Sequence, residues 1–158
     1  MGSLMLRIYF GHAMDDQHET AISARFDAVE ALFRSSGMQI IHTWDGRPSS
    51  GAATDVVRQD LLLMQTCDLV LLDMTLPGRN YVGCVGEMVY AHLAGLPAIV
   101  NVGQTDNGDR LWLQAHSTRI VASWPHALEA ARQIVRDLPR SEGRGGERWN
   151  DLLAWAPN

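Results

Sequence analysis

The chain has 158 residues, 46% of them hydrophobic, and its 18 acidic and 13 basic residues give a net charge of −5. This length and apolar content predict one folded domain and exclude intrinsic disorder over most of the chain. All 13 basic residues are arginine and none form a basic run, so we expect no nucleic acid polymer and no membrane as partner. Cys67 and Cys84 have no metal-ligand spacing and are too few for a disulfide scaffold, which predicts reduced thiols, no bound metal and a cytoplasmic protein.

Strand and helix patterns alternate along the chain. Short apolar runs predict strands at residues 4–10, 38–44, 68–73, 98–102 and 119–122. Apolar residues at three- and four-residue steps predict helices at about residues 19–36, 54–66, 83–94, 109–115 and 125–138. This alternation predicts an α/β fold with a doubly wound, five-stranded parallel sheet of the flavodoxin-like (Rossmann-like) order 2-1-3-4-5. Ligands of such sheets bind at the carboxyl ends of the strands.

We expect the folded domain to span residues 1–138 and a separate segment to follow at residues 139–158. This segment begins with a polar, glycine-containing stretch at residues 139–148, which predicts a linker. It continues with an apolar stretch that includes Trp149 and Trp155. Because such side chains are rarely left in water, the stretch is expected to dock on the domain or on a neighbouring subunit.

The carboxyl edge of the predicted sheet collects the residues that could carry chemistry. Glu87 falls in the first turns of a helix, where the helix dipole favours a carboxylate and small residues such as Gly83 let a ligand approach. On position alone, a glutamate that merely stabilises the helix start is an equally good interpretation. Asp73 ends the third strand, where it either binds ligand hydroxyls or caps the following loop.

Four segments together resemble the nucleoside 2-deoxyribosyltransferase superfamily. They are residues 8–11, residues 68–73, residues 80–91 and residues 95–97. The superfamily pattern is a tyrosine on the first strand, an aspartate before an apolar third strand, then G-x-x-x-E-x-G-x-A and G-K-P. The likeness covers residues 6–123, with Val89 in place of the preferred glycine and Leu96 in place of a common lysine.

The resemblance implies an enzyme that cleaves or exchanges the N-glycosidic bond of a nucleoside through a covalent glycosyl-glutamate, with no cofactor. Glu87 matches the family nucleophile, and Tyr9 matches the tyrosine that orients it. Asp68 matches the aspartate linked to protonation of the leaving base. The ordinary explanation of Tyr9 is a tyrosine packed in the core, and that of Asp68 is an aspartate that ends the preceding helix. Because family members commonly complete their pockets with a neighbouring subunit, we expect a homo-oligomer.

The candidate substrate-binding residues surround the same edge. They are Gly11, His12, Met14, Trp44, Asp73, Tyr81, Gly83 and Ser117. For His12, Met14 and Trp44, ordinary packing explains the residue equally well. Tyr81 stands six residues before Glu87, where transferases tend to carry an aspartate that selects the base and nucleotide hydrolases a serine near phosphate, so base preference does not transfer.

Phosphate handling separates the branches of the superfamily. Residues 11–16 contain two acids and no arginine, which favours an unphosphorylated nucleoside over a nucleotide as substrate. Arg79, or Ser117 with its neighbours at residues 117–119, could still hold a phosphate, so a nucleoside 5′-monophosphate N-glycoside hydrolase is the alternative.

Three further alternatives come from other protein classes. Residues 68–78 look like the phosphoacceptor strand of a receiver domain, with Asp73 as the acceptor, but a receiver needs a lysine and this chain has none. Residues 10–12 and the acids after them resemble a Toll/interleukin-receptor-like NAD glycohydrolase. A non-catalytic nucleotide-binding domain, with a structural Glu87, is the third.

Overall fold

A five-stranded sheet forms the centre of the protein. The computed structural model describes residues 5–13, 18–42, 52–138 and 146–155. All strands are parallel and follow the order β2-β1-β3-β4-β5. Their bounds are Leu6–His12 (β1), Met38–His42 (β2), Leu69–Asp73 (β3), Ala98–Asn101 (β4) and Arg119–Val121 (β5). The predicted α/β fold and its strand order are confirmed.

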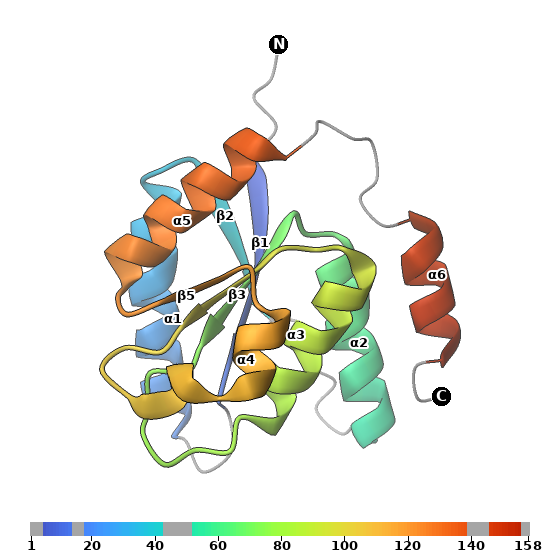
Figure 1. Cartoon of the computed structure of the whole chain (residues 1–158), viewed down its shortest axis with the longest axis horizontal. Coiled ribbons are helices and arrows are strands. Elements are labelled where there is room, and N and C mark those ends of the chain that lie inside the picture. The colour runs from blue at the N-terminus through green and yellow to red at the C-terminus, as the bar shows by residue number, and fades with distance from the viewer. Residues whose placement is uncertain (1–4, 14–17, 43–51, 139–145, 156–158) are drawn as a thin grey trace.

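Helices cover both faces of the sheet, as Figure 1 shows. One face carries α1 (Glu19–Arg34) and α5 (Trp124–Asp137). The other carries α2 (Ala53–Gln65) and α3 (Val82–Ala94), with α4 (Leu111–His116) beside α3. The 3-10 helix η2 (Asp106–Asp109) and the C-terminal helix α6 (Gly146–Trp155) complete the described elements.

Alternate strand residues face the two helical layers, so each face has its own apolar core. Tyr9, Val70 and Leu72 pack in the cluster under α2 and α3, whereas Phe10 and Leu71 pack in the cluster under α1 and α5. All five residues of β3 are buried, as expected for a central strand covered on both sides. A residue's parity along β1 or β3 therefore decides which layer its side chain enters.

The C-terminal helix docks on its own chain. Trp149 is only 1% exposed and belongs to the same apolar cluster as Tyr9 and Met88. Arg58 Nη1 of α2 lies 3.4 Å from the Leu153 carbonyl oxygen and donates to it. α6 contacts α2 and α3 on their outer side (Figure 1). Of the two docking partners expected for this segment, the domain itself is the one that holds Trp149.

Two predicted boundaries are corrected. The first strand extends to His12, because β3 continues to pair with it as far as Asp73. The predicted linker at residues 139–148 is too long, because α6 begins at Gly146, three residues before the buried Trp149. The 3-10 helix was not predicted; Thr105 caps it by accepting a hydrogen bond from the Asn107 amide.

Buried polar side chains gather at the carboxyl edge of the sheet. The last residues of β1, β2, β3 and β4 are all buried and polar, namely His12, His42, Asp73 and Asn101. Buried polar groups are retained only when they are hydrogen-bonded or serve a ligand, so this edge is the place to look for a site. Among the described residues, the helices are too short or too polar to cross a membrane.

Candidate active site

Glu87 and Tyr9 meet on the α2/α3 side of this edge. Tyr9 lies on β1 and Glu87 in the second turn of α3, and the phenol donates a hydrogen bond of 2.7 Å to Glu87 Oε1. Burial, followed by the charge of Glu87, raises the pKa of Tyr9 well above its ordinary value. The phenol therefore keeps its proton and holds the carboxylate in one orientation.

Gly11 makes room for that carboxylate. A Cβ at this position would collide with Glu87 Oε2 and would lie 2.7 Å from Leu72 Cδ2. Only glycine therefore allows the Glu87 side chain to lie against the β1 backbone. The sequence prediction placed Gly11 in the site, and the structure gives it this contact.

A second carboxylate, that of Asp60 on α2, acts on Tyr9 through its charge. Its negative charge raises the pKa of Tyr9, after burial and Glu87 in order of size. Asp60 is half-buried, and it precedes Met64, a fully buried residue on the same helix face, by four positions. The protonated Tyr9 phenol thus experiences the charges of two carboxylates, one on α2 and one on α3.

Asp73 belongs to the opposite face. Asp73 Oδ1 accepts hydrogen bonds from the backbone amide and the hydroxyl of Thr75, at 3.0 and 2.7 Å. Asp73 Oδ2 lies 3.6 Å from Arg25 Nε of α1. The carboxylate is 1% exposed, so it caps the following loop and pairs with Arg25. Such a buried side chain is not accessible as the phosphoacceptor of a receiver domain.

The structure places Asp68 at the amino end of the sheet. Its Oδ2 accepts a hydrogen bond from the Arg7 amide at 2.9 Å, and its own amide donates to the Arg7 carbonyl at 2.8 Å. These bonds join the starts of β1 and β3, several residues away from the edge where Glu87 lies. They give Asp68 a structural role there, but this role is to join two strands, whereas the ordinary explanation expected it to end the preceding helix.

Tyr81 closes the loop before α3. Its hydroxyl accepts a hydrogen bond from the Leu76 amide at 2.8 Å and donates one to the Leu76 carbonyl at 3.1 Å. The ring is buried, and the backbone adopts the left-handed conformation with φ of 55°, which costs a non-glycine residue about 1–2 kcal/mol. The Tyr81 hydroxyl is thus bonded within the loop, and the expected role of Tyr81 in substrate binding is not supported.

Solved structures share this architecture. No protein-family model and no curated protein matches the chain. A 2-desoxiribosyltransferase from Leishmania mexicana is 16% identical over 84% of this chain and 99% of its own, with a TM-score of 0.61. A conserved protein from Enterococcus faecalis is 16% identical over 82% and 99%, with a TM-score of 0.59. A CMP N-glycosidase from Clostridium botulinum is 13% identical over 81% and 98%, with a TM-score of 0.53.

The chain shares the fold of these three proteins. In this fold the remaining predicted residues occupy different places. Gly83 lies in the first turn of α3, four residues before Glu87, and a Cβ there would meet nothing within 4 Å. His12 enters the α1/α5 layer together with Phe10. Met14 and Trp44 lie outside the described residues.

Ser117 lies far from the edge that carries Glu87. It follows α4, and the next residue, Thr118, donates its amide proton to the carbonyl of Ala98 at the start of β4. The Ser117 hydroxyl donates to the Leu113 carbonyl at 2.5 Å. Within one chain, Ser117 therefore caps α4 at the amino edge of this deoxyribosyltransferase-like sheet and does not line the site.

Three residues of this edge were not predicted. They are Asp60, Arg25 and His42. Asp60 and Arg25 lie on helices whose charged residues look solvated in the sequence, and His42 lies in a strand. A signal was present for Asp60, because its spacing from Met64 puts a carboxylate on the buried face of the helix.

Proposed function

We propose that the protein cleaves or exchanges the N-glycosidic bond of a nucleoside, with Glu87 as the nucleophile. The observation that carries this proposal is the 2.7 Å hydrogen bond from Tyr9 to Glu87 at the carboxyl edge. Two of the proteins that share the fold, the 2-desoxiribosyltransferase and the CMP N-glycosidase, are named for chemistry at this kind of bond. Fold and geometry together support the choice over a binding domain with a structural glutamate.

The reaction follows from the geometry in two steps. A Glu87 oxygen attacks C1′ of the sugar, and the bond from C1′ to the base nitrogen breaks with its electrons going to the base. Water or a second base then attacks C1′ and releases the Glu87 carboxylate. Tyr9 stays protonated because burial opposes its ionisation, and so does the charge of Glu87 while that side chain is a free carboxylate. The hydrogen bond from Tyr9 orients the nucleophile before the substrate reacts, so this ordering does not add to the activation barrier.

The leaving base needs a proton, and Asp60 is the best candidate donor. Its charge acts on Tyr9, the residue bonded to Glu87, whereas Asp68 is bonded to the Arg7 backbone at the other end of the sheet. A general acid must lie within hydrogen-bond reach of the atom it protonates. The proton donor is therefore reassigned from Asp68 to Asp60 in this proposal.

Arg25 supports a second candidate substrate, a nucleoside 5′-monophosphate. The absence of arginine at residues 11–16 favoured an unphosphorylated nucleoside, but Arg25 of α1 reaches the carboxyl edge from outside that segment. Its side chain is 20% exposed. The Asp73 carboxylate at 3.6 Å offsets part of its charge, which keeps the nucleoside as the first candidate.

Self-association through α3 and α4 is part of the proposal. Large apolar side chains of these two helices are strongly exposed, among them Val82 (76%), Leu111 (78%) and Trp112 (60%). Val82 begins the helix that carries Glu87, so a second copy seated here would lie beside the site. Because Trp149 is buried in its own chain, α6 does not offer that side chain to a partner.

The test is a panel of nucleosides and their 5′-monophosphates, each incubated with and without a second free base. Chromatography of the products separates the outcomes. Free base alone indicates hydrolysis, and a new nucleoside indicates transfer. Arg25→Gln should raise KM for a monophosphate and leave KM for the matching nucleoside unchanged if phosphate is recognised there. Absence of any product across the panel contradicts the proposed function.

A further inference from the structure

Two buried histidines meet head to head at the carboxyl edge, on the face opposite Glu87. His12 Nε2 of β1 and His42 Nε2 of β2 lie 2.8 Å apart. The ring planes differ by only 5° and the ring centroids are 5.1 Å apart, which is the geometry of an in-plane hydrogen bond between two ring nitrogens. The residues are 8% and 5% exposed, and Phe26 packs 4.2 Å from the His42 ring.

The neighbouring carbonyl determines which nitrogen carries the proton. His12 Nδ1 lies 3.0 Å from the Ala13 carbonyl oxygen, which can only accept. His12 Nδ1 therefore carries a proton, and in the neutral ring its Nε2 is the acceptor. His42 Nε2 must then be the donor of the bond between the two rings. One proton thus joins the two strands, and losing either partner leaves a buried ring nitrogen of the other residue without this bond.

The bond attaches β2 to the β1 residue that follows Gly11. In the backbone pairing of β1 with β2, Phe10 lies opposite His42. On the other side, β3 pairs with Gly11 and His12. The His42 side chain therefore holds the end of β1 from the β2 side. The residue held between these two attachments is Gly11, against which the Glu87 carboxylate lies.

We infer that His12 and His42 are positioning residues, a clasp that fixes the Gly11 backbone so that Glu87 keeps its productive orientation. The inference rests on the proposed function for its kinetic consequence. A small displacement of Gly11 would shift the carboxylate toward or away from C1′, which affects kcat more than KM. Misplacement of this kind costs about ten- to a hundred-fold in rate.

The bond can be observed without turnover. In ¹⁵N-histidine-labelled protein, a scalar coupling between the two Nε2 nuclei is expected, together with a protonated Nδ1 on His12. Amide hydrogen exchange at Gly11 reports how firmly the strand end is held. Absence of the coupling in the wild-type protein would overturn the inference, whatever the variants do.

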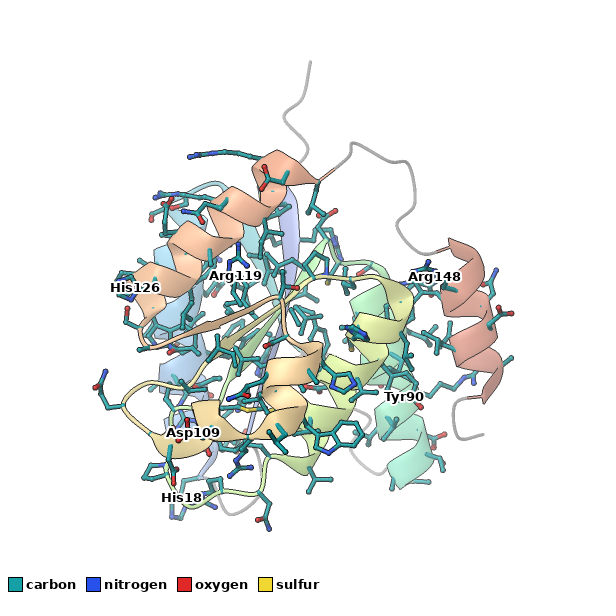
Figure 2. All side chains as sticks on the ribbon, viewed as in Figure 1. His18, Tyr90, Asp109, Arg119, His126 and Arg148 are labelled. Carbon is teal, nitrogen blue, oxygen red and sulfur yellow. The ribbon has the colours of Figure 1, made fainter. Side chains whose placement is uncertain are left out.

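Variants then separate positioning from packing. His42→Phe keeps an aromatic ring but removes the donor, so we expect kcat to fall about ten- to a hundred-fold with KM nearly unchanged and Gly11 exchange to accelerate. His42→Gln restores a donor at a similar distance and should recover most of both. His126→Phe is the matched control, because His126 is exposed and lies on the outer side of α5 (Figure 2).

Each outcome has a distinct meaning. Equal kcat values for His42→Phe and His42→Gln would show that packing alone matters and would contradict the clasp. If His42→Phe does not fold, the coupling and the comparison of His42→Gln with wild type still decide. If no nucleoside is turned over by the wild-type protein, the coupling and the Gly11 exchange still test the clasp, and only the proposed function fails.

Discussion

The two faces of the carboxyl edge differ in what their buried polar groups do. On the α2/α3 face, Tyr9 donates a hydrogen bond to Glu87, and the charge of Asp60 acts on Tyr9. On the α1/α5 face, polar groups bond mainly to the scaffold: Asp73 caps its loop, and His12 binds His42. The first arrangement suits groups that must react with a ligand, and the second suits groups that hold strand ends in place. Alternate strand residues at this edge point to opposite faces of the sheet. The candidate reacting groups therefore lie on one face and the groups that hold the strand ends lie on the other.

The largest effect is expected at Glu87. Glu87→Gln keeps the shape and the hydrogen bond from Tyr9 but removes the nucleophilic carboxylate, so turnover should fall at least about a thousand-fold. Initial rates on the best nucleoside of the panel, with circular dichroism to verify folding, provide the measurement. A well-folded variant with near-native turnover would show that Glu87 is not the nucleophile and that the reacting groups do not lie on the α2/α3 face.

Asp60 is expected to rank next, and Asp68 provides its matched control. Asp60→Asn should lower the rate about 100- to 10,000-fold on substrates whose base needs a proton. Asp68→Asn keeps an oxygen that can accept the Arg7 amide and should change the rate less than about three-fold. A nitrophenyl glycoside, whose leaving group needs no proton, should restore much of the Asp60→Asn rate. A larger rate loss in Asp68→Asn than in Asp60→Asn would identify Asp68 as the proton donor instead.

Tyr9→Phe should have an intermediate effect. The variant loses one positioning hydrogen bond to Glu87 and keeps the ring in the core, so kcat should fall about ten- to a hundred-fold. Because burial and Glu87 raise the pKa of Tyr9, the phenol stays protonated at neutral pH, and the wild-type rate should not decline through its ionisation below pH 10. Rate–pH profiles of wild type and variant measure both points.

Asp73→Asn should affect rate least and stability most clearly. The variant removes a buried charge that pairs with Arg25 and weakens the cap on Thr75, so unfolding in urea should require about 1–3 kcal/mol less. Turnover of an unphosphorylated nucleoside should stay within about three-fold of wild type. A rate loss as large as that of Glu87→Gln would place Asp73 among the reacting groups and would end the distinction between the faces.

The sequence was informative where a pattern is periodic or local. Apolar runs and helical spacing predicted the five parallel strands, and the resemblance paired Tyr9 with Glu87 across 78 positions. The sequence patterns did not predict contacts in which a side chain reaches from a helix to the end of a strand. Arg25 belongs to α1 yet contacts the end of β3, and nothing in its neighbours indicates this reach. Tyr81 adopts a left-handed backbone conformation, which a non-glycine residue does not suggest in the sequence and which the structure of the folded loop imposes.

The central claim is that Glu87 forms a covalent bond to the sugar. Intact-protein mass spectrometry after incubation with a slow 2′-fluoro nucleoside tests it most directly. We predict that the wild-type chain gains the mass of one fluorinated sugar, that peptide mapping places it on Glu87, and that Glu87→Gln gains nothing. A wild-type chain that turns the analogue over with no added mass, or that carries the sugar on another residue, would contradict the account.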